Sequence, residues 1–357
     1  MVRDYSIDSV KGVCLLHMFV LHIFIIYGFF DAKGAASEFY FNALSFFMSS
    51  FYFFSGFFFK SPENGNEMKY IRSKVKKFII PLITWSVISL PFVYCKDYLL
   101  TNIKSKNKKR TFITGFTFIL MSSIIYFNTG GVKWLEPFTF VLPLGCLRSN
   151  DALWFLSSLF LVNVIFFIVN RRLSGKRLFV FILLCYLYSF VDSKILPCVF
   201  NSSNVSLGIV YFYGGYMFRK ASMKYSIFRV WYFILACVLY VLIMTFDPQY
   251  LMFVSLGQVK GYYILNLVFS ISGIYILWFV FKKLPRISLF VYFGEHSMSL
   301  YVWHMIPLRL VLDPLIKYYY PECPFILYFI TMLVTICLTA WIIEYCLGRK
   351  FSILLGY

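Results

Sequence analysis

Apolar segments recur along the whole chain and are separated by short polar stretches. A helical apolar run of about 20 residues spans the ~30 Å hydrocarbon core of a bilayer, although several runs here are shorter. The runs are continuous, whereas barrel strands alternate over about ten residues. The pattern therefore predicts an all-α, polytopic transmembrane helical bundle with spans near residues 12–30, 39–59, 78–95, 112–127, 153–169, 178–191, 207–218, 228–246, 262–281, 289–307 and 325–346.

The composition agrees with a membrane protein. Hydrophobic residues make up 61% of the 357 residues and charged residues only 14%, against about 25% charged in a typical soluble domain. The mean hydropathy is +0.76. No linker, low-complexity tract or obvious repeat divides the sequence, so residues 1–357 are expected to form one integral-membrane domain. The first apolar run lacks a small-residue cleavage site and is expected to stay as the first span.

Positive charge is concentrated between the spans. The formal net charge is +19, which in a soluble protein would indicate nucleic-acid binding. Here cation-rich loops alternate with cation-poor loops, and cation-rich loops stay in the cytoplasm. This pattern favours membrane orientation over nucleic-acid binding and predicts that both termini are cytoplasmic. The predicted cytoplasmic segments are residues 60–77, 170–177, 219–227 and 282–288, followed by the C-terminus with Arg349 and Lys350.

Two cytoplasmic termini require an even number of crossings, whereas eleven segments are candidates. The conflict lies between residues 78 and 152, where the basic run 104–110 would be external if 78–95 crosses fully. Either 78–95 or 112–127 does not cross, or the apolar stretch 137–147 adds another crossing. We favour about ten spans, with twelve as the alternative.

The cysteines give no sign of a metal site or a disulfide framework. Nine are present, without a CxxC spacing, and most lie in apolar runs. They are expected to be small buried apolar residues, and no bound metal is predicted.

Three ionisable residues share one stripe of the first span. An α-helix turns ~100° and rises ~1.5 Å per residue, so Lys11 lies ~20° from His22 and ~16 Å along the axis from it. Asp8 lies ~40° from His22, whereas His17 lies ~140° away on another face. Ionisable groups in a span usually face a protein interior or a cavity. The stripe is consistent with a reactive imidazole, although a buried, purely structural histidine gives the same pattern.

Further candidates follow along the chain, each with a simpler explanation. Cations after the second span could bind phosphate or only mark a cytoplasmic helix end. Small residues ending the second span could only aid packing, and a tryptophan opening the fifth could only belong to the interfacial belt. A polar face near the C-terminus could be structural. The residues concerned are Arg72, Lys74 and Lys77, then Ser55, then Trp154, then Ser297, Tyr301 and His304.

These motifs, in this order, resemble the membrane-bound acyltransferase 3 family over essentially the whole chain. Lysine replaces the family's more common arginine at Lys11 and in the basic pair, and the Lys11 form resembles its surface-polysaccharide O-acetyltransferase branch. The matching motifs are Ile7–Gly12 with His22, Phe54–Phe57, Lys74 and Lys77 before Pro81, Leu153–Leu156, and Ser297 with Tyr301 and His304.

The resemblance implies a multi-pass O-acyltransferase of the cell membrane. It would take an acyl group, most often acetyl, from cytoplasmic acyl-CoA to a hydroxyl of a cell-surface or lipid-linked glycan. The catalytic residues would be His22, as base or transient acyl carrier, and Asp8 on the same stripe. Lys11, Arg72, Lys74 and Lys77 would contact the donor, and Ser55, Trp154, Ser297, Tyr301 and His304 the acceptor.

A transporter or flippase for a lipid-linked saccharide is the alternative function. Such a protein would also be an aromatic-rich bundle with buried polar groups. Many transporters contain structural repeats, and none is visible in the sequence, which favours the enzyme.

Overall fold

A computed structural model describes most of the chain as helix and, in the residues it describes, no strand. The described residues form two compact units, and each unit is described by itself. The first contains the described residues within 1–21, 28–74 and 158–297, and the second contains those within 22–27, 75–157 and 298–357. The structure describes residues 4–28, 43–62, 65–89, 91–92, 153–189, 202–246, 263–347 and 352–356.

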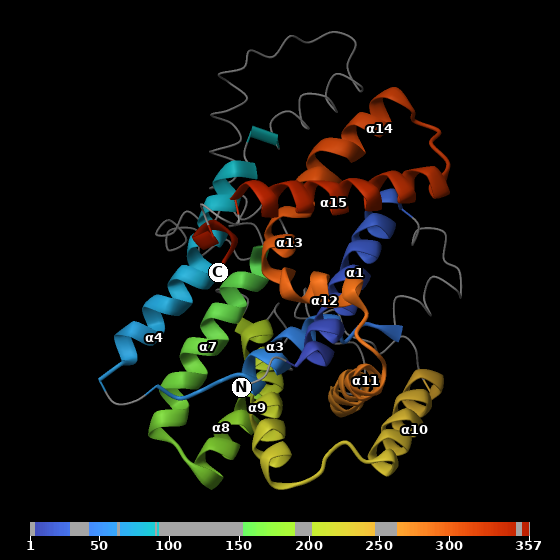
Figure 1. The fold of residues 1–357 in the computed structure, drawn as a ribbon. Coiled ribbons are helices and arrows are strands. Elements are labelled where there is room, and N and C mark those ends of the chain that lie inside the picture. The colour runs from blue at the N-terminus through green and yellow to red at the C-terminus, as the bar shows by residue number, and fades with distance from the viewer. Residues whose placement is uncertain are drawn as a thin grey trace. The chain divides into compact units, whose positions relative to one another are not determined.

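The first unit is built from packed helices (Figure 1). Helix α3 packs on α9, α8 also packs on α9, and α10 pairs with α11. The helices with residues in this unit are α1 (Tyr5–Tyr27), α3 (Phe47–Phe57), α4 (Glu67–Lys74), α7 (Trp154–Arg172), α8 (Gly175–Tyr188), α9 (Ser202–Lys224), α10 (Val230–Phe246), α11 (Tyr263–Lys283) and α12 (Ser288–Glu295).

Glycines allow α3 and α9 to touch backbone to backbone. A Cβ atom added to Gly56 would lie 1.8 Å from the carbonyl oxygen of Phe212, and one added to Gly215 would lie 1.8 Å from that of Phe53. Helices approach this closely in a membrane where small residues face each other, because dispersion contacts replace the missing hydrophobic drive.

Aromatic side chains fill the core beside this crossing. Trp278 of α11 is 2% exposed and meets the rings of Phe54 and Phe57 edge to face, at centroid distances of 5.4 and 5.0 Å. Its indole N–H donates to the Ser6 hydroxyl over 3.0 Å. Edge-to-face pairs add about 0.5–1.5 kcal/mol beyond burial, so this cluster holds the start of α1 against α11.

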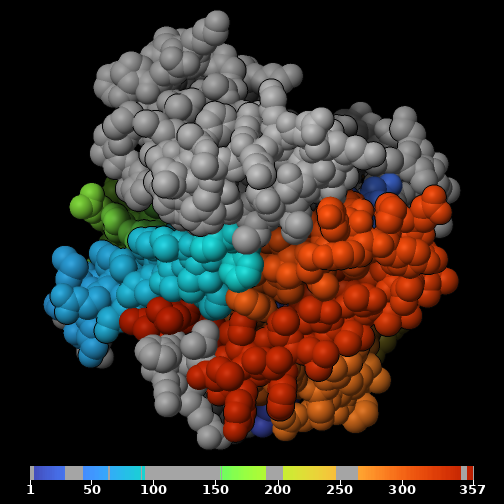
Figure 2. All heavy atoms as spheres, turned by 90° about the horizontal axis from the view of Figure 1, so that it is seen from above, coloured from blue at the N-terminus to red at the C-terminus, as the bar shows by residue number. Residues whose placement is uncertain are grey.

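The second unit gathers the end of α1 and the C-terminal helices. The long α15 packs on η10, and Asp313 at the start of α14 accepts a 2.9 Å hydrogen bond from Tyr328 of α15. Much of α15 is exposed on the face drawn in Figure 2, and only 22% of its most apolar 18-residue stretch is buried. The remaining elements are η2 (Val75–Ile79), α13 (Ser297–Trp303), η10 (Ile306–Leu312), α14 (Asp313–Tyr319), α15 (Phe325–Leu347) and η11 (Ser352–Leu355).

The predicted helical class is confirmed, and several predicted spans coincide with helices. In the described part, four helices are long and apolar enough to cross a membrane: Tyr5–Tyr27, Phe155–Arg172, Ile264–Lys283 and Phe325–Cys346. About ten spans and cytoplasmic termini remain predictions. The segments 112–127 and 137–147 and the basic run 104–110 lie outside the described residues.

Two predicted segments differ from the structure. Residues 60–77, expected as a loop, are helical from Glu67 onward through α4 and η2. The span expected at 289–307 is broken, because α12 ends at Glu295 and α13 begins at Ser297. Glycine, histidine and serine, which occupy 294, 296 and 297, form helices less readily than alanine or leucine.

Candidate functional site

Helix α1 carries the three predicted ionisable residues on one unbroken helix. Asp8 is only 6% exposed, and its carboxylate lies 2.8 Å from the Lys11 ammonium, one turn on. The Lys11 side chain keeps 21% of its surface exposed. Asp8 and Lys11 belong to the first unit and His22 to the second, so the helix itself relates them. The i,i+3 pairing follows from helix geometry, and burial of its carboxylate makes it more than a surface pair.

A second glycine crossing fixes the backbone beneath Asp8. A Cβ on Gly12 of α1 would lie 2.0 Å from the carbonyl oxygen of Phe290, and a Cβ on Gly294 of α12 would lie 1.8 Å from that of Asp8. The two helices therefore press backbone against backbone at the residue that bears the carboxylate. The position of the Asp8–Lys11 pair depends on this contact.

In the second unit, His22 meets His304. Their ring centroids are 5.3 Å apart, and His304 is fully buried, whereas His22 is partly exposed. Nδ1 of His304 lies 2.7 Å from the Tyr301 carbonyl oxygen. Because a carbonyl only accepts, Nδ1 carries the hydrogen, and Nε2 of the neutral ring carries the lone pair. The predicted catalytic histidine thus meets one member of the predicted polar face, His304.

Arg309 is near this pair and was not among the predicted site residues. It interacts electrostatically with His22 and lies, half-buried, in the π-helical η10. Nothing in the local sequence distinguishes it from other cations such as Lys317. Short π-helical turns often occur at functional sites, but their register is visible only in the structure.

The predicted donor-binding cations lie along a single helical segment. Arg72 and Lys74 are in the last turn of α4, and Lys77 follows in η2. Glu67 forms an ion pair with Arg171 of α7, which anchors the start of α4. That hydrogen bond lowers the pKa of Glu67 to about 2. Within the first unit, the basic end of α4 is therefore part of an ordered helix.

The other predicted acceptor contacts have varied surroundings. Ser55 of α3 accepts a 3.2 Å hydrogen bond from Asn163 of α7, so it joins two helices. Tyr301 is buried, with its ring 5.6 Å from that of Phe155. Trp154 begins α7, and Ser297 begins α13. Neither Ser55 nor Ser297 belongs to the unit that contains His22.

His17 is buried and packs against an aromatic ring. Its side chain is 3% exposed, and its ring meets Phe47 edge to face at 5.4 Å. Among the described residues, no group of three or more histidine, cysteine or acidic side chains is arranged to hold a metal ion.

Comparison with known protein families gives a match over nearly the whole chain. A family model described as an acyltransferase domain matches residues 4–345. No curated protein and no solved structure matches the chain.

Proposed function

The chain belongs to the acyltransferase 3 family, and from this premise we propose that it is a membrane O-acyltransferase that moves an acetyl group from acetyl-CoA to a glycan hydroxyl. The observation that carries the proposal is the contact between His22 and His304, with Arg309 acting on the same ring. An imidazole, a second imidazole of defined tautomer and a guanidinium supply a base, a polar partner and a positive charge.

The transfer needs one proton acceptor and one stabiliser of negative charge. As the acceptor hydroxyl oxygen attacks the thioester carbonyl carbon, His22 takes the hydroxyl proton. Arg309 stabilises the charge that develops on the carbonyl oxygen. The carbon–sulfur bond then breaks, and the leaving thiolate takes the proton back from His22. The products are the ester and the free thiol of coenzyme A, and the histidine returns to its neutral form.

A transient acyl carrier is the second route to the same products. In that case, a ring nitrogen of His22 attacks the carbonyl carbon, the thiol leaves, and the hydroxyl then removes the acyl group. Incubation with labelled acetyl-CoA in the absence of acceptor separates the two routes. Label that stays on the protein and requires His22 supports the carrier. If no label stays on a preparation that transfers acetyl normally once the acceptor is added, the result supports the base.

Lys11 suits the phosphates of the donor. It lies ~16 Å along the helix axis from His22, too far to touch the same reacting atom, but coenzyme A carries its phosphates far from its sulfur. The proposed cytoplasmic N-terminus places Lys11 on the side where acyl-CoA is made, and Arg72, Lys74 and Lys77 would face the same compartment. Reporter fusions at the C-terminus measure this orientation, and an external reporter would remove the support for donor binding at Lys11.

The decisive variant is His22→Ala, assayed with labelled acetyl-CoA and membrane glycan. We expect transfer to fall by at least about 10²-fold, the usual range for loss of a general base, with expression and insertion retained. His17→Ala is the matched control, since it makes the same change on the same helix at a buried site beside Phe47. It should retain transfer per folded molecule. Wild-type transfer by a well-folded His22→Ala protein would remove the central residue of the proposal.

A further inference from the structure

A cavity of about 440 Å³ opens at the N-terminal end of α1. Its walls come from the first residues of α1 and from the turn that joins α11 to α12, both in the first unit. Small-molecule sites typically measure ~300–1,000 Å³. The lining includes Asp4, Tyr5, Ser9, Lys282 and Arg286, none of which is among the residues assigned above to the donor or the acceptor.

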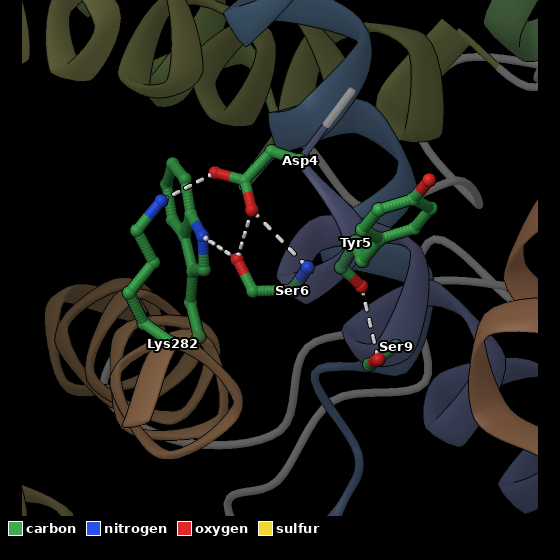
Figure 3. Close-up of polar contacts among 6 residues, drawn as sticks. Asp4, Tyr5, Ser6, Ser9 and Lys282 are labelled. Carbon is green, nitrogen blue, oxygen red and sulfur yellow. Dashed lines mark hydrogen bonds and ion pairs between the residues drawn. The ribbon is translucent and has the colours of Figure 1, made fainter. Parts of the chain in front are cut away.

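A hydrogen-bonded network fixes one wall of this cavity (Figure 3). The Asp4 carboxylate lies 2.7 Å from the Lys282 ammonium and accepts hydrogen bonds from the backbone N–H and the hydroxyl of Ser6. Ser6 in turn accepts from the buried Trp278. Burial opposes ionisation of Asp4, but Lys282 and Ser6 outweigh it and lower the pKa of Asp4. The cavity therefore offers a fixed carboxylate beside an ammonium.

The lining also combines a flat ring with a second cation. The Arg286 guanidinium lies 4.2 Å from the centre of the Tyr5 ring, and 40% of the Tyr5 surface is exposed. Both groups are planar, so a nucleobase can stack on either one. The guanidinium N–H groups can also donate hydrogen bonds to the oxygens of a phosphate. Two cations against one carboxylate leave the lining positive.

We infer that this cavity binds the adenosine 3′-phosphate end of the acyl-CoA donor. The inference rests on the proposed function and adds where the nucleotide lies. Arg286 and Lys282 would hold the 3′-phosphate, and Tyr5 with Arg286 would stack on the adenine. Asp4 would accept a hydrogen bond from the ribose hydroxyl or the adenine amino group.

An anionic lipid headgroup shares the phosphate chemistry but suits the cavity less well. The Asp4 carboxylate would repel a phosphodiester that has no donor to offer it, whereas a nucleoside supplies hydroxyl and amino donors. The stacking surface of Tyr5 and Arg286 also has no counterpart in a simple headgroup. These features favour the nucleotide.

Equilibrium binding to the full-length purified protein tests the inference, with adenosine 3′,5′-bisphosphate and adenosine 5′-monophosphate as probes. The wild type should bind the bisphosphate more tightly. Arg286→Ala and Lys282→Ala should each weaken bisphosphate binding about tenfold, the effect of losing a charge-assisted contact. The 5′-monophosphate, which lacks the 3′-phosphate, should be much less affected.

Lys283→Ala is the matched control, because the neighbouring ammonium lies near the Phe279 ring instead of lining the cavity. It should bind both probes like the wild type. Unchanged bisphosphate binding in Arg286→Ala and Lys282→Ala would overturn the inference. The inference would also be overturned if the variants lost bisphosphate binding only when the anionic phospholipid content was varied. That result would assign the cavity to a lipid headgroup.

The two proposals fail in different ways. A wild type that binds the bisphosphate through Arg286 but transfers no acetyl group removes the proposed function and keeps the nucleotide site. A wild type that transfers acetyl while Arg286→Ala keeps the normal KM for acetyl-CoA and its 3′-dephospho form removes the site and keeps the function.

Discussion

Two pairs of helices in the first unit meet through reciprocal glycines, and they differ in what lies beside the contact. At the α3–α9 crossing, Gly56 and Gly215 press against the carbonyl groups of phenylalanines. At the α1–α12 crossing, Gly294 presses against the carbonyl of Asp8, whose side chain pairs with Lys11. Glycine-mediated backbone contact thus supports the aromatic core at the α3–α9 crossing. At the α1–α12 crossing, it positions the Asp8–Lys11 ion pair.

The largest expected effect is on stability, from Gly215→Ala. The new methyl would lie 1.8 Å from the Phe53 carbonyl oxygen, so the helices must separate. Overpacking typically lowers the free energy of unfolding by about 1–3 kcal/mol and occasionally more. We expect the upper end of this range, because the backbone that the methyl meets is rigid. Gly214→Ala is the control, because its methyl would meet only the Phe53 ring at 3.8 Å. Thermal unfolding should show a large loss for the first variant and little for the second, and equal unfolding temperatures would contradict the crossing.

Gly294→Ala should lower stability in a similar way and should also lower transfer per folded molecule. Its methyl would lie 1.8 Å from the Asp8 carbonyl oxygen, which displaces the segment that bears Lys11. Initial rates normalised to folded protein measure the difference, with Gly56→Ala as the comparison. Equal normalised rates for the two variants would mean that both crossings serve packing alone.

A smaller and more specific effect is expected from Lys11→Ala. The KM for acetyl-CoA should rise about tenfold, as for loss of one charge-assisted contact to phosphate, while kcat changes less. Lys11→Arg should retain activity, because arginine keeps the charge and binds phosphate. The kinetic series that contradicts this role is one in which Lys11→Ala lowers kcat and leaves KM unchanged.

Local geometry made part of the site predictable. The stripe of Asp8, Lys11 and His22 follows from helical periodicity, and α1 runs unbroken from Tyr5 to Tyr27. The approach of His304 to His22 joins residues 282 positions apart, and no local pattern encodes it. No local pattern identified Arg309 as part of the site either. The Asp4–Lys282 pair likewise depends on tertiary packing of α1 against α11.

The broken segment after α11 shows the limit for the fold. Hydropathy locates an apolar stretch near 289–307 but averages over the change at His296 and over the π-helical turn that begins at Ile306. The helix of residues 67–74 was not predicted, because its many cations indicated only on which side of the membrane the segment lies.

The glycine crossings also limit which second-site suppressors can exist. Where an added methyl strikes a side chain, as Gly273 would strike the ring of Phe46, a smaller residue at Phe46 can restore the fit. At Gly56, Gly215, Gly12 and Gly294 the obstacle is a backbone carbonyl, which every amino acid carries. No substitution at the clashing residue itself removes it. A genetic screen should therefore recover reversion to glycine at these four positions, and compensating changes at Phe46 for Gly273.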